Sequence, residues 1–125
     1  MNILKLPYLV AFVIPSLGRK KNQTLKKEKR QEAIEITLKE LEGLFGGATT
    51  MESRGVTRML DGTVLVDHEQ TLVLTGTTRK EFLSKKAAIE KVAVEVGKML
   101  DQEAVAVLAY DSDSYIVELR PEERE

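Results

Sequence analysis

The sequence predicts an α+β protein with the ferredoxin-like split βαβ arrangement, in which an antiparallel sheet carries two helices on one face. The segments follow the order strand, helix, strand, strand, helix, strand, with a short extra strand at the C-terminal end. The first and third strands, which are central in this arrangement, are the apolar run Tyr8–Ile14 and the longest β-like run, Thr63–Gly76. A length of 125 residues is the usual size of one domain. We therefore expect a single domain over residues 1–119 and a charged tail over residues 120–125.

The composition narrows the kinds of site that the chain can build. Its net charge is −1, and it has no cysteine and one histidine. Disulfides, thiolate metal sites, cysteine nucleophiles and a His-rich zinc site within one chain are therefore excluded. An aromatic content of 5% and the lack of tryptophan disfavour a base-stacking platform for single-stranded nucleic acid. We expect no cofactor, no membrane association and a cytoplasmic location.

The first strand is predicted over Tyr8–Ile14, because this run is apolar on both faces and Pro15 follows it. Lys5 and the apolar run after it also fit the start of a secretory signal peptide. However, no A-x-A cleavage site follows the apolar run. A dense basic cluster follows it instead, and a secretory signal peptide does not carry such a cluster on that side. The strand is therefore the favoured interpretation, and the fold prediction assumes that it is retained.

The next segment has the spacing of an amphipathic helix, which we expect over Thr24–Leu44 with Thr24 as its N-cap. Its apolar side chains recur every three or four residues, at Ala33, Ile34, Leu38, Leu41 and Phe45. The first two turns are rich in lysine, so we expect them to project into solvent. Gly46–Gly47 is predicted to end the helix.

A hairpin is predicted after this helix. Its first strand is Ala48–Met59, and Asp61–Gly62 is a strong turn signal before the long strand. The tip that carries Arg54 and Arg58 is expected to be mobile. The long strand is polar on both faces at Asp67–Gln70, so it must leave the core there or bend at a bulge.

The second helix is expected over Thr78–Leu100, because Thr78 and Glu81 have the spacing of a capping box. Gly97 lowers the helix propensity and is predicted to mark a close approach to the sheet.

Two short strands, Ala104–Tyr110 and Tyr115–Leu119, complete the prediction, with a turn at Asp111–Ser114 between them. Asp111 and Asp113 are spaced like the start of a calcium loop. The glycine and glutamate that such a loop needs further on are missing, so we interpret these residues as part of the turn.

The basic segment, residues 19–30, is the first candidate site. It holds seven cations and one acid, although the whole chain has a net charge of −1. Cations at the start of a helix oppose its dipole, and positive potential beside free backbone N–H groups favours phosphate binding. The candidate ligand-binding side chains, including two from the hairpin, are Arg19, Lys20, Lys21, Lys26, Lys27, Arg54 and Arg58. The alternative is a solvated surface helix, since no glycine-rich phosphate motif accompanies the segment.

His68 is the single histidine and the one candidate general base. Asp67 and Glu69 flank it, but in a regular strand they lie on the opposite face, so only a bulge would let them converge with His68. The alternative is an exposed polar stretch where the strand leaves the sheet. No catalytic motif supports the enzymatic interpretation.

The hypothesis that fits these features best is a non-enzymatic, homo-oligomeric binding or regulatory module, most simply a dimer. It would recognise an anionic small molecule or an acidic protein through the basic segment. The first alternative is a small dimeric α+β-barrel enzyme that uses His68 and a nearby carboxylate. The second is a nucleic-acid-binding protein that uses the basic segment, against which a pI near 6.0 and few aromatic residues count.

Overall fold

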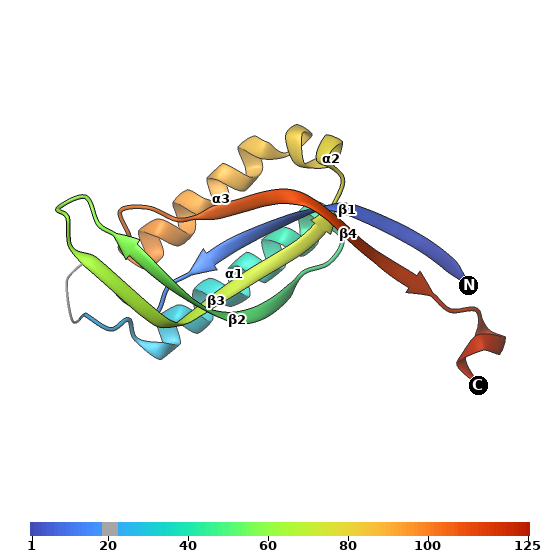
Figure 1. The fold of residues 1–125 in the computed structure, drawn as a ribbon, viewed down its shortest axis with the longest axis horizontal. Coiled ribbons are helices and arrows are strands. Elements are labelled where there is room, and N and C mark those ends of the chain that lie inside the picture. The colour runs from blue at the N-terminus through green and yellow to red at the C-terminus, as the bar shows by residue number, and fades with distance from the viewer. Residues whose placement is uncertain (19–22) are drawn as a thin grey trace.

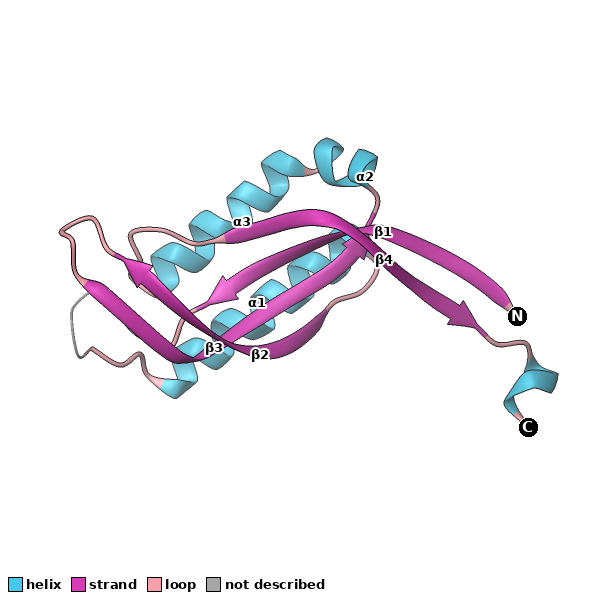
Figure 2. Ribbon diagram, in the orientation of Figure 1, coloured by secondary structure: helices cyan, strands magenta, loops and turns pink. Residues whose placement is uncertain are grey.

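The computed structural model describes residues 1–18 and 23–125. Within these residues, a four-stranded antiparallel sheet has the order β2-β3-β1-β4 and carries its helices on one face (Figures 1 and 2). The elements are β1 (Asn2–Ile14), α1 (Lys27–Phe45), β2 (Thr49–Arg58), β3 (Val64–Thr77), α2 (Arg79–Ser84), α3 (Lys86–Met99), β4 (Val107–Glu118) and the 3-10 helix η1 (Pro121–Arg124). The predicted ferredoxin-like arrangement and the central position of β1 and β3 are confirmed. No helix in the described part of the chain combines the length and the apolarity that a membrane crossing requires.

The hydrophobic core lies between the sheet and the helical layer. Along β1, Val10, Phe12 and Ile14 are fully buried, as the alternation of side chains along a strand requires for one covered face. Val73, also fully buried, is the neighbour of Phe12 on β3. The helices contribute Ala33, Ile34, Leu41, Ile89, Val92 and Val96 to this core. Each buried valine, leucine, isoleucine or phenylalanine side chain stabilises the fold by about 1.5–3 kcal/mol relative to an exposed one.

The two central strands extend beyond the region in which they pair with each other. β1 and β3 pair only over residues 8–14 and 71–77. Beyond this region the sheet continues as two two-stranded ribbons, which leave opposite ends of the molecule (Figure 1). The hairpin ribbon consists of residues 56–66, from β2 through the turn into β3. The terminal ribbon consists of residues 2–6 of β1 and residues 114–118 of β4.

The polar middle of β3 forms the predicted bulge. The register of β2 against β3 shifts between Ser53, which pairs with Gln70, and Gly55, which pairs with Asp67. An added Cβ atom at Gly55 would lie 2.5 Å from Oε1 of Gln70, so a side chain there would require the Gln70 amide to move. The bulge turns β3 away from the core at the residues where the sequence becomes polar.

The predicted hairpin turn is confirmed. Gly62 has a φ of 90°, which favours glycine, and the N–H of Met59 donates to the carbonyl of Thr63 over 2.7 Å. Arg54 and Arg58 lie within β2, which pairs with β3 as far as Arg58. The strand predicted over Ala48–Met59 is therefore confirmed at these two residues, and the expected mobility of the tip stays a prediction.

Helix α1 begins at Lys27, and Thr24 is not its N-cap. Thr24 forms an antiparallel bridge with Leu17, and the N–H of Leu25 donates to the carbonyl of Ser16 over 2.9 Å. These contacts keep the chain extended past Thr24, so the N-cap is Lys26, two residues later than predicted. Its predicted end is confirmed by Gly46, which has a φ of 93°.

The predicted second helix is divided into α2 and α3 at Lys85. Thr78 is its N-cap as predicted, and its hydroxyl accepts from the N–H of Glu81 over 3.1 Å. The break allows the short α2 to set the Phe82 ring 5.2 Å from the ring of Tyr8. It also brings Nζ of Lys85 within 2.5 Å of the Leu44 carbonyl, which ties this corner to the end of α1.

The two predicted C-terminal strands are one strand, β4, and the turn predicted at Asp111–Ser114 is wrong. The register of β4 against β1 shifts between Leu6 and Tyr8, so a bulge absorbs these polar residues. The strand continues because β1 begins as early as Asn2 and offers a partner to residues 114–118. Gly97 approaches the loop before β4 and not the sheet: an added Cβ atom would lie 3.3 Å from Val105 Cγ2.

Candidate functional site

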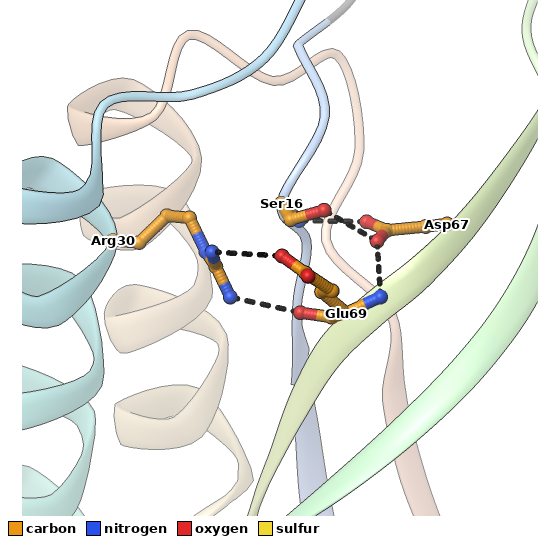
Figure 3. Close-up of polar contacts among 4 residues, drawn as sticks. All are labelled: Ser16, Arg30, Asp67 and Glu69. Atoms are coloured by element: carbon orange, nitrogen blue, oxygen red, sulfur yellow. Dashed lines mark hydrogen bonds and ion pairs between the residues drawn. The ribbon is translucent and has the colours of Figure 1, made fainter.

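Asp67 is the one buried acidic side chain in the described part of the chain. It lies in the bulge of β3 and is only 5% exposed. Its carboxylate accepts hydrogen bonds from the N–H of Ser16 over 2.6 Å, from the Ser16 hydroxyl over 2.5 Å and from the N–H of Glu69 over 3.0 Å (Figure 3). Ser16 follows the end of β1, so the contact fastens the central strand to the bulge.

The hydrogen bonds keep this buried carboxyl ionised. Burial by itself raises the pKa of Asp67, but bonds from the Ser16 side chain and from the backbone N–H groups of Ser16, Glu69 and Leu17 outweigh it. The pKa therefore lies below its ordinary value of 3.8. The interpretation of residues 67–70 as a wholly exposed polar stretch is wrong for Asp67. No local signal pointed to Ser16, since the two residues are 51 positions apart.

Arg30 forms a second contact with the bulge, from the side of α1. Its Nη2 donates to the backbone carbonyl of Glu69 over 2.8 Å, and Nη1 lies 3.9 Å from Oε2 of the same residue (Figure 3). Its Nε is buried and has no hydrogen-bond partner among the described residues. Arg30 therefore holds α1 against β3 and is not one of the freely exposed cations of the basic segment.

The structure does not bring His68 together with a carboxylate. His68 is exposed, while the carboxylate of Asp67 is buried and held by Ser16. Glu69 contacts Arg30. Across residues 1–18 and 23–125, no hydrogen bond or ion pair joins His68 to an acid. The bulge is present, but it turns Asp67 toward β1 and leaves the proposed pair apart.

The predicted anion-binding residues fall into three groups. Arg19, Lys20 and Lys21 lie outside the described residues. Lys26 and Lys27 are exposed at the start of α1, where Lys26 is the N-cap and makes no side-chain capping bond. The remaining two, on β2, are exposed as well: Arg54 and Arg58. Figure 1 shows the start of α1 and the hairpin ribbon at the same end of the molecule.

No group of three or more histidine, cysteine, aspartate or glutamate side chains in the described residues is arranged to hold a metal ion. Asp111 and Asp113 are both exposed on β4.

No family model and no curated protein sequence matches the chain. Among solved structures, a phage SAM lyase in complex with S-methyl-5'-thioadenosine has a TM-score of 0.57 and 15% identity, covering 94% of this chain and 95% of that chain. The same kind of enzyme in the apo state has a TM-score of 0.56 and 15% identity, covering 89% of this chain and 85% of that chain. CutA from Pyrococcus horikoshii has a TM-score of 0.48 and 19% identity, covering 86% and 85%. At these identities, the likeness to the phage lyase shows a shared fold and nothing more.

Proposed function

We propose that this chain is a self-associating binding module whose copies assemble head to tail through their edge strands and ribbons. The observation that carries the proposal is the amount of apolar surface on two ribbons that no helix covers. On the hairpin ribbon, Val56 is 70% exposed, and its partner Val66 is about half exposed. On the terminal ribbon, Tyr115 is 61% exposed, and Ile3, Leu4, Ile116 and Val117 are each nearly half exposed.

Ribbons of this kind are poorly stable alone. A two-stranded β-ribbon is marginal in water unless a further strand or layer packs on it. The terminal ribbon has apolar pairs on both faces, Ile3 with Val117 on one and Leu4 with Ile116 on the other. A surface helix or strand of a monomer would normally present polar residues there, so these pairs favour a protein partner.

The charges of the two edge strands favour a second copy of the chain as that partner. β2 carries two arginines and one glutamate, while β4 carries three acids and no lysine or arginine. Contact between β2 of one copy and β4 of the next therefore joins opposite charges, whereas like edges would repel. A heterologous contact of this kind closes into a ring when the rotation between copies allows it.

The second part of the proposal is recognition of an anionic ligand or an acidic partner by the basic segment and by Arg54 and Arg58. The support for it is the exposure of Lys26 and Lys27 beside a helix start that already carries partial positive charge. Because Arg30 contacts Glu69, it is left out of the proposed binding set.

Analytical ultracentrifugation at micromolar concentration tests the assembly. We expect the wild-type chain to sediment as an oligomer and both Val56→Asp and Ile116→Asp to be monomeric, with unchanged far-UV circular dichroism. The matched control is Val94→Asp, because the exposure of Val94 lies between those of Val56 and Ile116 but Val94 is on α3. This variant should remain oligomeric.

Mixing the two monomeric variants tests the head-to-tail geometry. Each variant keeps one intact end, so an equimolar mixture should form a heterodimer with a single junction and nothing larger. A monomeric wild-type chain, or a mixture that stays monomeric, would contradict the proposal.

A further inference from the structure

A cavity of about 270 Å³ lies at the end of β1, between the hairpin ribbon and the loop that joins α3 to β4. This volume is slightly below the usual range for pockets that hold drug-sized ligands. Its apolar walls include Val13, Pro15, Leu65 and Val105. It therefore has the size and the lining for a small, largely apolar molecule of one or two rings.

Side-chain contacts hold the walls of this cavity in place. Glu103, in the loop before β4, accepts a hydrogen bond from the N–H of Leu60 over 3.0 Å and so ties that loop to the hairpin ribbon. Gln102 donates from Nε2 to the carbonyl of Leu17 over 3.2 Å, which fastens the same loop to the chain after β1. The Asp67–Ser16 contact fixes the third side. The loop before β4 and the chain after β1 are thus held in place by contacts within the protein. The cavity is therefore largely formed before any ligand enters.

Two side-chain amides at the wall have hydrogen-bonding capacity to spare. Gln70 uses Oε1 to accept from the Ser53 hydroxyl over 3.3 Å, and its Nε2 has no partner among the described residues. Gln102 donates from Nε2, and its Oε1 accepts no bond within the described part of the chain. Thr57 is also among the residues that line the cavity. The wall thus offers a donor and an acceptor to a ligand with the complementary pair.

The charges at the cavity disfavour an anion. Two carboxylates line it, those of Asp67 and Glu103, against one cation, Arg58. Nη1 of Arg58 points to the Gly62 carbonyl at 3.5 Å, toward the hairpin turn. A negatively charged ligand would meet two like charges in a partly apolar site, which is a large cost.

From this geometry we propose that the cavity binds an uncharged small molecule with a flat apolar body and a carboxamide-like donor and acceptor. Among the described residues, the lining of this site contains no residue of the basic segment, shares only Arg58 with the proposed anion-binding residues, and comes from one chain. The inference is therefore independent of the proposed self-association.

Nuclear magnetic resonance titration of the ¹⁵N-labelled chain tests the inference with three probes of nearly equal shape: nicotinamide, benzamide and nicotinate. We expect nicotinamide and benzamide to shift the side-chain amide signals of Gln70 and Gln102. Nicotinate, which replaces the carboxamide by a carboxylate, should bind at least about tenfold more weakly because of the like charges. Failure of both amides to shift these signals, or equal binding of nicotinate, would overturn the inference.

Variants separate the cavity from other surfaces. Thr57→Val removes the hydroxyl of a lining residue at nearly constant shape and should weaken nicotinamide binding several-fold. Thr50→Val, on the same strand but away from the cavity, should leave the affinity unchanged. Equal losses in the two variants would contradict the site. Ile116→Asp should bind nicotinamide as the wild type does, whatever its state of assembly, and a loss of binding there would contradict a site formed within one chain.

Discussion

Asp67→Asn is the sharpest test of the contact that joins β1 to the bulge of β3. The substitution keeps the shape of the side chain but removes its charge and replaces one acceptor oxygen by an amide group. In the wild-type chain, three donors from Ser16 and Glu69 converge on the carboxylate, at 2.5 to 3.0 Å. One of these donors must therefore face the amide N–H₂ of asparagine and lose its acceptor.

The expected loss follows from the burial of this group. A hydrogen bond to a charged partner contributes about 1.5–3 kcal/mol, and leaving a buried donor unsatisfied costs about 1–3 kcal/mol. These two effects overlap, so we expect the free energy of unfolding to fall by roughly 2–4 kcal/mol at pH 7. Urea denaturation followed by circular dichroism measures this change, with an unaltered m-value showing that the folded state stays compact.

The same substitution has a defined pH dependence. The pKa of Asp67 in the folded chain lies below the ordinary value of 3.8. Ionised Asp67 therefore stabilises the fold fully above the ordinary pKa, and this stabilisation is lost as the pH falls through the folded-state pKa. The difference between wild type and Asp67→Asn should be largest near neutrality and shrink as the pH drops below 3.8.

Asp61→Asn is the matched control. Asp61 also accepts a backbone hydrogen bond, from the N–H of Thr63 over 2.9 Å, but it is exposed at the hairpin turn. We expect this variant to unfold close to the wild type. The reasoning is refuted if Asp67→Asn differs from the wild type by less than about 0.5 kcal/mol at pH 7, the range of an ordinary surface substitution. A difference that persists unchanged in acid would also refute it.

Two further predictions concern the glycines and the basic segment. Gly62→Ala should lower the free energy of unfolding by about 1–2 kcal/mol, because Gly62 has a left-handed backbone conformation that alanine adopts only at a cost. Gly43→Ala should instead raise the free energy of unfolding by about 0.5–1 kcal/mol, because Gly43 lies in α1 with open space around it. Thermal denaturation measures both changes, and two shifts of the same sign would contradict the prediction. In calorimetric titration with pyrophosphate, the double variant Lys26→Glu and Lys27→Glu should bind several-fold more weakly than the wild type. Lys80 is an exposed cation on α2, and Lys80→Glu should leave the pyrophosphate affinity unchanged. Equal weakening in this variant would mean that pyrophosphate is attracted by the overall charge and not by a defined site.

The local pattern of the sequence was enough to predict most of the elements. Thr78 caps its helix, Gly46 ends α1, and Asp61–Gly62 forms the hairpin turn. The central position of β1 and β3 could also be predicted, because these strands carry the apolar run Tyr8–Ile14 and the longest β-like run, and such runs need a neighbour on each side. Caps and turns depend on residues within a few positions of one another, so their signals can be recognised in the sequence alone.

The candidate sites depended on contacts that no local pattern contains. The seven candidate anion-binding residues could be named from the sequence. The charge pattern gave Arg30 the same weight as the neighbouring cations, but in the structure Arg30 contacts Glu69. The cavity wall combines the end of β1, the hairpin ribbon and the loop before β4, which lie far apart along the chain.

The tertiary structure alone decided what became of the polar stretches. Asp111–Ser114 has the composition of a turn, yet it continues β4 because the early start of β1 supplies hydrogen-bond partners on the far side of the bulge. Asp67 is of a residue type that usually lies in exposed loops. It is nevertheless buried, because Ser16 supplies hydrogen-bond donors that replace water. In both places, a group that would otherwise need solvent is satisfied by a residue distant in sequence, and only the folded chain brings the two together.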